Sequence, residues 1–234
     1  MIKIIDNIIQ KHLVPSGNFI YGYCDLTGLL DKKFIGFNYG ISIGIKLDPG
    51  IVDKVINGPT PEYFSHYRKA NSDLALLTKS ISEELTLNNI ESLAVTPTVS
   101  TSDLDTIYFD TLRTDLSHKM VATRAGLGWI GKTDLFVSKE FGPRLRLVSI
   151  LLKTPVKAKS RPIDKSRCGK CTICVDICPA KAANGKLWNI KVDRNEFYDP
   201  WKCRDKCAEF GRIKLGQDAR VCGICVSACP VGKA

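Results

Sequence analysis

Two motifs, each made of closely spaced cysteines, constrain this chain more than any other feature of its sequence. Nine of its ten cysteines lie between Cys168 and Cys229. The first motif, RCGKCTICVDICPA, has the pattern C-x2-C-x2-C-x3-C-P, with thiols at Cys168, Cys171, Cys174 and Cys178. The second motif, CGICVSACP, repeats the later part of that pattern with Cys222, Cys225 and Cys229. This spacing is typical of bacterial ferredoxins that hold two 4Fe-4S clusters.

In such ferredoxins the cysteine before the proline binds the other cluster of the pair. The spacing therefore predicts that Cys229 completes a cluster held by Cys168, Cys171 and Cys174. By the same rule, Cys178 crosses to the cluster held by Cys222 and Cys225. The eighth ligand is then either Cys203 or Cys207.

Two glycines within the motifs fit this arrangement. Gly169 and Gly223 each follow a predicted ligand directly. Glycine lets the backbone lie close to a cluster and direct N–H groups at its sulfurs. Zinc is the main alternative, since four thiolates at CxxC spacing also form closed tetrahedral sites. The third cysteine of the first motif and the two Cys-Pro endings favour iron–sulfur clusters.

The cellular compartment expected from the sequence also favours metal or redox chemistry for the cysteines. No apolar run approaches the roughly 20 residues that span a bilayer. The N-terminal MIKIIDNIIQKHL is interrupted by Asp6, Gln10 and Lys11, where a signal peptide needs an apolar stretch. We therefore expect a cytoplasmic protein with no membrane partner, in which dense cysteines indicate metal or redox chemistry. Cys24, in the apolar run FIYGYC, is expected to be a buried, inert thiol.

The positive net charge suggests a nucleic-acid partner, but bound clusters would reduce that charge. The chain has 34 Lys and Arg against 24 Asp and Glu, a formal charge of +10. Each 4Fe-4S cluster with four thiolates carries about −2, which lowers the net charge to about +6. A solvated basic surface is the simpler interpretation, and no aromatic-interleaved RNA-binding motif is recognisable in the sequence.

The sequence before the motifs interleaves helix and strand patterns. Helices are predicted over residues 2–13, 60–87 and 114–124, the second beginning near Pro61 and the third ending on Gly126 as a C-cap. The segments NFIYGYC, YGISIGIKL and IESLAVTP are predicted strands. DLFVS and RLRLVSILLK flank the turn-rich KEFGP and are predicted to pair with each other.

These patterns predict an α/β (α+β) domain over residues 1–153. The following stretch KTPVKAKSRPIDKSR is polar, basic and interrupted by proline, as expected of a linker. A small ferredoxin-like domain with two 4Fe-4S clusters is then expected over residues 154–234.

A glycine-rich run, ATRAGLGWIGKTDLFVS, lies between the predicted helix and the linker. Its glycines suggest that the backbone turns sharply or lies close against another group. The spacing matches neither a phosphate-binding loop nor a dinucleotide fingerprint.

Together, AGLGWIGK and the two later motifs resemble epoxyqueuosine reductase and its shorter relatives, a family related to the reductive dehalogenases. The resemblance covers roughly residues 100–234 and implies a short relative that lacks the C-terminal helical repeats. It implies a cobalamin-binding domain fused to a two-cluster domain that passes single electrons to the cobalt. It also implies Cys203 as the eighth ligand, and it places near the corrin the residues Gly126, Gly128, Trp129, Gly131 and Lys132.

The chain departs from the family pattern at the expected proton donor. The reductases carry Asp-x-x-Pro-x-x-Glu before the glycine run, and the aspartate serves as the acid. Without a gap, its three defining positions fall here on Leu112, Asp115 and His118. Asp110 takes the place of the acid if two residues are inserted, and it is the predicted catalytic residue. His118 is either another acid or a structural histidine.

The resemblance implies a cobalamin-dependent iron–sulfur reductase that acts on a modified nucleoside or another small electrophile. An external donor such as ferredoxin or flavodoxin would supply the electrons, and transfer RNA is a weaker candidate partner. The alternative is a non-catalytic electron carrier or corrinoid-reducing protein.

Overall fold

The computed structural model describes residues 2–13 and 18–233, and the chain divides into two compact units. The first unit comprises residues 1–46, 70–127 and 146–163, and the second comprises 47–69, 128–145 and 164–234. The boundary predicted after residue 153 treats the chain as two consecutive pieces. The compact units instead alternate along the sequence. Residues 47–69 and 128–145, which precede that boundary, belong to the same unit as the cysteine motifs.

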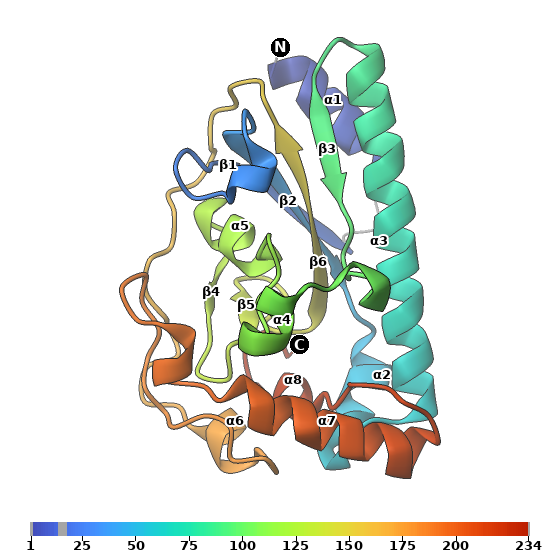
Figure 1. The fold of residues 1–234 in the computed structure, drawn as a ribbon, viewed down its shortest axis with the longest axis vertical. Helices are drawn as coiled ribbons and strands as arrows, with labels where there is room; N and C mark the ends of the chain where they lie inside the picture. Colours follow the sequence, from blue (N-terminus) through green and yellow to red (C-terminus); the bar gives the residue numbers. More distant parts are fainter. Residues whose placement is uncertain (1, 14–17, 234) are drawn as a thin grey trace. The chain divides into compact units, whose positions relative to one another are not determined.

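The first unit is built on a four-stranded sheet with the order β1-β2-β6-β3 (Figure 1). The strands are β1 (Phe19–Asp25), β2 (Tyr39–Lys46), β3 (Ser92–Val95) and β6 (Leu145–Leu152). β1 pairs antiparallel with β2, and β3 pairs antiparallel with β6. The predicted mixture of helices and strands is confirmed.

Helices pack on both faces of this sheet. Ile5 and Ile9 of α1 (Ile2–His12) and Leu74 of α3 (Pro61–Leu87) share one core with Tyr23 and Ile150 of the sheet. A second core contains Val121 of α5 (His118–Arg124) with Cys24 and Leu151, which point to the opposite face from their neighbours. α3 begins at Pro61, as predicted.

Cys24 and the end of α5 also agree with the sequence. Cys24 is fully buried, and burial raises the pKa of its thiol to about 12, so it stays a protonated, inert thiol. After α5 the chain turns at Gly126, which has φ +72°. The Gly126 and Leu127 N–H groups donate to Thr123 and Ala122 carbonyls at 3.1 Å each. Gly126 therefore lies directly after the Ala125 C-cap, in the left-handed conformation that commonly follows a helix end.

The second unit contains little regular structure. Its strands β4 (Gly128–Ile130) and β5 (Phe136–Ser138) form a hairpin. Its helices are α2 (Pro49–Val52), α6 (Ile173–Asp176), α7 (Pro200–Leu215) and α8 (Ile224–Ala228). Short 3-10 turns in the chain are η1 (Lys32–Phe34), η2 (Asp53–Asn57), η3 (Thr101–Asp103) and η4 (Arg194–Glu196), and a short helix α4 (Thr106–Thr111) belongs to the first unit.

The predicted pairing of DLFVS with RLRLVSILLK is wrong. β5 pairs with β4, so that Val137 lies opposite Trp129, whereas β6 belongs to the four-stranded sheet. The Gly131 N–H donates to the Leu135 carbonyl at 2.8 Å and closes the hairpin. The following segment bends back at once, since the Ser138 N–H donates to the Gly142 carbonyl at 2.8 Å. This tight turn separates β5 from β6.

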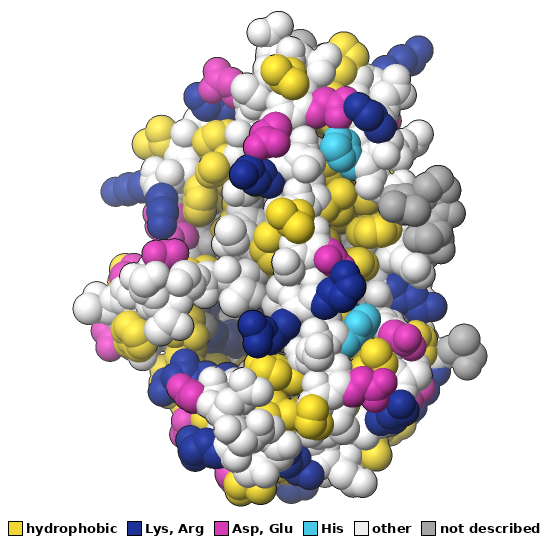
Figure 2. All heavy atoms as spheres, turned by 90° about the vertical axis from the view of Figure 1, so that its right-hand side faces the viewer, with side chains coloured by type: hydrophobic (Ala, Val, Ile, Leu, Met, Phe, Trp, Pro, Cys, Tyr) yellow, Lys and Arg dark blue, Asp and Glu magenta, His cyan; other side chains and the backbone are white. Residues whose placement is uncertain are grey.

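The helices bear on the expectation of no membrane partner, and the surface charges bear on a nucleic-acid partner. Among the described residues no helix combines the length and apolarity needed to cross a bilayer. On the face shown in Figure 2, lysine and arginine side chains are interspersed with aspartate and glutamate. The positive net charge is therefore not gathered into one patch on that face.

Candidate metal centre

Four thiols from distant parts of the sequence come together as a first set in the second unit. Cys168, Cys171 and Cys174 lie before and within α6, and Cys229 directly follows α8. Burial raises the pKa of Cys174, and the neighbouring thiols Cys168, Cys229 and Cys171 raise it further. Burial likewise raises the pKa of Cys229, with Cys168 and Cys171 among its neighbours. The structure thus brings Cys229 beside the three thiols that the crossed pattern assigns to it.

A second set of thiols gathers between α7 and α8. Cys203 and Cys207 lie one helical turn apart on α7, with 3.9 Å between their sulfurs. Cys207 also hydrogen-bonds with Cys222, and Cys225 has Cys222 and Cys203 as neighbours. The hydrogen bond from Cys207 lowers the pKa of Cys203 to about 7 and lowers that of Cys222. Either sulfur of the Cys203–Cys207 pair could be the donor.

Cys178 lies two residues after the end of α6. Its N–H donates to the Val175 carbonyl at 3.3 Å, and its carbonyl accepts from the Lys181 N–H at 3.1 Å. Within the described residues, Cys178 is not among the main neighbours of the second-set thiols. The assignment of Cys178 to that set stays a prediction.

Thr133 connects the two sets. This buried residue belongs to the glycine-rich run, and its hydroxyl hydrogen-bonds with both Cys174 of the first set and Cys225 of the second. Cys174 is also an electrostatic neighbour of Cys225. A hydroxyl has one proton, so Thr133 donates to one sulfur at a time. Because Thr133 reaches a thiol of each set, the two sets adjoin at this residue.

The glycine run itself lies against the first set. The Trp129 indole Nε1–H donates to the Cys168 sulfur at 3.4 Å, and a Cβ at Gly131 would lie 3.7 Å from the same sulfur. The Arg167 guanidinium lies 6.0 Å from the centre of the Trp129 ring. Hydrogen bonds to cluster sulfurs are one of the factors that set reduction potentials. Part of the run expected beside the corrin thus contacts the thiols.

Close backbone approach explains two of the glycines without a cofactor. A Cβ at Gly128 would lie 2.1 Å from the Val137 carbonyl oxygen across the hairpin. A Cβ at Gly126 would lie 2.6 Å from the Arg161 carbonyl oxygen within the first unit. The expected close approach exists at both positions, but the neighbour is the protein's own chain. Lys132 is buried as well.

The donor set fits two 4Fe-4S clusters. Each set offers soft thiol ligands, and polar donors reach their sulfurs from Trp129, Thr133 and Tyr198, whose hydroxyl hydrogen-bonds with Cys203. Gly169 and Gly223 have φ +53° and +89°, a region that favours glycine, and so allow the turns beside the ligands. Sequence reasoning missed Thr133 and Tyr198 because neither has a fixed spacing from the cysteines it contacts.

A sequence profile of the family described as "4Fe-4S double cluster binding domain" matches residues 167–232. That stretch contains both cysteine motifs together with Cys203 and Cys207. The C-terminal part of the chain is therefore a double 4Fe-4S cluster domain, which decides against the zinc alternative.

Comparison with curated proteins narrows the relationship. The epoxyqueuosine reductase of Lactococcus garvieae (strain Lg2) is 37% identical over 113 residues, which cover 48% of this chain and 31% of the relative. The resemblance to epoxyqueuosine reductases indicated by the motifs is thus confirmed. The matched part spans about a third of the length of the curated relatives.

Solved structures share the fold. An epoxyqueuosine reductase with an epoxyqueuosine-modified tRNA stem loop matches with a TM-score of 0.58 and 18% identity, over 99% of this chain and 65% of that chain. A reductive dehalogenase studied for B12-dependent dehalogenation matches with a TM-score of 0.64 and 16% identity, over 92% of this chain and 30% of that chain.

His118 is a half-buried residue of the first unit, with a hydrogen-bond partner at each ring nitrogen. Its Nε2 lies 2.9 Å from the Thr96 carbonyl, and its Nδ1 lies 2.9 Å from the Ser149 hydroxyl. Because a carbonyl oxygen accepts, Nε2 donates and Nδ1 accepts. Burial lowers the pKa of His118 to about 4. A neutral ring with both nitrogens hydrogen-bonded favours the structural interpretation of His118, which stays a prediction.

Asp110 is exposed on α4. This short helix is capped by Asp105, whose carboxylate accepts from the Tyr108 N–H at 2.8 Å. Leu112, where the ungapped family pattern would place its acid, has φ +51° and ends the helix. Asp110 is therefore the acidic side chain presented on α4, and its catalytic role stays a prediction.

Proposed function

We propose that this chain is an iron–sulfur oxidoreductase of the epoxyqueuosine reductase type. Its two 4Fe-4S clusters pass electrons to a bound cobalamin for the reduction of a modified nucleoside or another small electrophile. The observation that carries this proposal is the junction at Thr133, where thiols of the two predicted ligand sets adjoin.

The two clusters suit a two-electron reduction. Each cluster transfers one electron, so the reduced pair together holds the two electrons that such a reduction consumes. Two protons must also reach the substrate, and Asp110 is proposed to deliver one of them. The ligands proposed for the first cluster are Cys168, Cys171, Cys174 and Cys229; those for the second are Cys178, Cys203, Cys222 and Cys225. An external donor such as ferredoxin or flavodoxin recharges the clusters.

Cobalamin would supply a cobalt centre that is reduced one electron at a time. The solved reductive dehalogenase studied for B12-dependent chemistry supports this proposal through its shared fold. The residues proposed near the corrin remain Gly126, Gly128, Trp129, Gly131 and Lys132. The protein's own backbone fills the space beside Gly126 and Gly128, so close packing within the chain accounts for these two glycines without a corrin.

Transfer RNA is a weaker proposed partner. One solved neighbour holds a tRNA stem loop, which is a property of that protein. On the face in Figure 2 the charges are mixed, so the positive net charge adds little support there. A free modified nucleoside and other small electrophiles remain in the proposed substrate class.

Equilibrium titration with cobalamin tests the proposed function. Anaerobically prepared, iron-replete protein is expected to bind cobalamin with saturation at one per chain. Dithionite reduction of the clusters should then be followed by reduction of the bound cobalt, visible in the corrin absorption bands. Protein that carries both clusters and binds no cobalamin would contradict the proposal and favour the electron-carrier alternative.

Replacing Asp110 tests the proton donor. The Asp110→Asn variant is expected to keep its iron and bind cobalamin as the wild type does, while turnover falls by about a hundredfold or more, the usual contribution of a general acid. Asp103→Asn is the matched control, since Asp103 is an exposed carboxylate on the preceding turn η3. Equal turnover of the two variants would remove Asp110 from the catalytic role.

A further inference from the structure

Arg144 is one of the largest fully buried side chains in the protein. It lies directly before β6, and 1% of the residue surface is exposed. A guanidinium is always charged in proteins, and burying a charge is costly unless it is paired and hydrogen-bonded. The position of this arginine therefore calls for partners that balance its charge.

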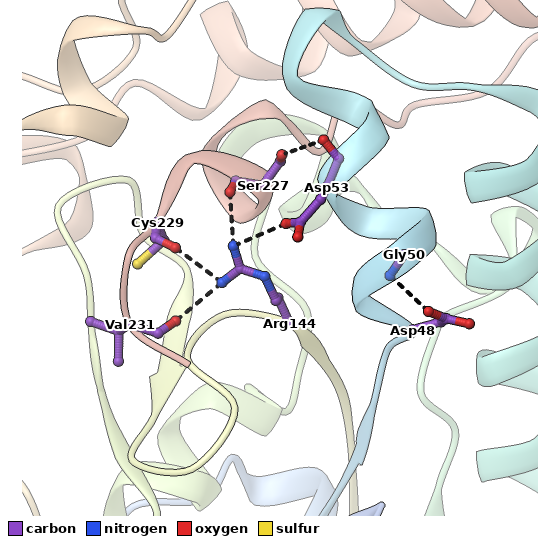
Figure 3. A network of polar contacts seen from close by, with 7 residues as sticks. All are labelled: Asp48, Gly50, Asp53, Arg144, Ser227, Cys229 and Val231. Carbon is purple, nitrogen blue, oxygen red and sulfur yellow. Dashed lines mark hydrogen bonds and ion pairs between the residues drawn. The ribbon is translucent and has the colours of Figure 1, made fainter. Parts of the chain in front are cut away.

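Its hydrogen bonds converge on the segment around Cys229 (Figure 3). One terminal nitrogen, Nη1, donates to the Cys229 and Val231 carbonyls at 3.0 and 3.1 Å. The other, Nη2, donates to the Ser227 carbonyl at 2.8 Å. These carbonyls lie at and after the end of α8, where a helix leaves acceptors without partners in its own backbone. Arg144 thus holds the backbone on both sides of a predicted cluster ligand.

The adjoining backbone is packed equally closely. A Cβ at Gly142 would lie 1.9 Å from the Val231 carbonyl oxygen, and one at Gly232 would lie 2.2 Å from the Phe141 carbonyl carbon. The turn that precedes Arg144 therefore lies directly against the segment that follows Cys229. The guanidinium and this turn fix one side of the Cys229 segment.

The charge of Arg144 is incompletely balanced by protein groups. Among the described residues, the carboxylate that contacts Arg144 is that of Asp53, whose Oδ1 lies 3.4 Å from Nη2, and the Asp53 side chain is half-exposed. The Arg144 Nε–H is buried and has no hydrogen-bond partner in the described part of the chain. A 4Fe-4S cluster with four thiolates carries about −2, and one more negative charge when reduced. The cluster that includes Cys229 would supply the missing negative charge.

We propose that Arg144 is a positioning residue for the cluster that includes Cys229, and that its buried charge makes this cluster easier to reduce. The hydrogen bonds hold the ligand segment, and the positive charge favours the reduced, more negative state of the cluster. This inference rests on the proposed ligation by Cys229. It assigns to the cluster site a residue that lies outside both cysteine motifs.

Redox titration of anaerobically reconstituted full-length protein, followed by EPR, tests this role together with iron analysis. Arg144→Gln removes the charge and keeps a hydrogen-bonding side chain. At a fixed potential, its ratio of reduced to oxidised cluster should fall about tenfold or more for one cluster and stay unchanged for the other. Arg144→Lys keeps the charge and should restore most of that ratio. Arg146→Gln is the matched control, because Arg146 lies two residues further on and bonds Asn71 instead.

Asp53→Asn provides a second test if Arg144→Gln loses iron. Removing the half-exposed carboxylate leaves the Arg144 charge less balanced, so the same cluster should become easier to reduce. Unshifted titrations of iron-replete Arg144→Gln and Asp53→Asn would overturn the inference. If Arg144→Gln cannot be loaded, an unshifted Asp53→Asn titration alone overturns it. Wild-type protein that takes up no iron would instead contradict the proposed function.

Discussion

Replacing Cys229 by alanine is expected to remove one cluster and about half of the roughly eight iron atoms that two 4Fe-4S clusters contain. The structure places Cys229 beside Cys168, Cys171 and Cys174, which lie more than fifty residues earlier in the sequence. A cube that loses one of four thiolates is open to solvent at one iron. Iron and sulfide analysis of anaerobically prepared protein measures the loss.

Double substitutions test the crossing directly. Adding Cys171→Ala to Cys229→Ala should cost no further iron, because both thiols belong to one cluster. Adding Cys225→Ala should remove nearly all remaining iron. Cys225 is only four residues from Cys229 in the sequence, but it is predicted to bind the other cluster. The reverse pattern would show that each motif binds its own cluster. Cys24→Ala is the matched control and should keep the full iron content, since Cys24 lies in the core of the other unit.

The second large effect is expected at Cys203. The Cys203→Ala variant should lose the second cluster, whereas Cys207→Ala should keep about eight iron atoms per chain. Two thiolates on different irons of one cube are held apart by the inorganic core, but the Cys203 and Cys207 sulfurs lie only 3.9 Å apart. One of the pair therefore suits a donor better than a second ligand. The resemblance favours Cys203 as the ligand.

Cys178→Ala completes this experiment. The crossed pattern predicts that it loses the cluster bound by Cys222 and Cys225 and keeps the other. If Cys178→Ala keeps both clusters while Cys207→Ala loses one, the second set is Cys203, Cys207, Cys222 and Cys225, and α7 must rearrange to separate two of its sulfurs. Iron analysis and EPR of the variants distinguish these results.

Features set by short-range spacing could be predicted from the sequence. The cysteine motifs indicated the clusters, Pro61 marked the start of α3, and Gly126 marked the end of α5. These depend on backbone preferences or ligand spacing over a few residues.

The contacts that complete the site depend on long-range packing. Arg144 reaches carbonyls more than eighty residues away, and Trp129 donates to a sulfur thirty-nine residues away. Neither contact has a fixed sequence signature. The β4–β5 pairing was missed because the turn between Gly131 and Leu135 folds β5 back onto β4, whereas the sequence pattern placed the pairing turn after β5, at KEFGP.

The interleaving of the two compact units limits how this protein can be dissected or recombined. A fragment cut at residue 154 would keep every thiol of both sets but would lack Trp129, Thr133 and Arg144, which come from an earlier stretch of the same unit. Grafting the cysteine-rich tail onto another protein would therefore transfer the ligands without the groups that surround them. Exchange of this cysteine-rich unit between proteins would have to carry over all three of its segments, because a single fusion point transfers only the last of them.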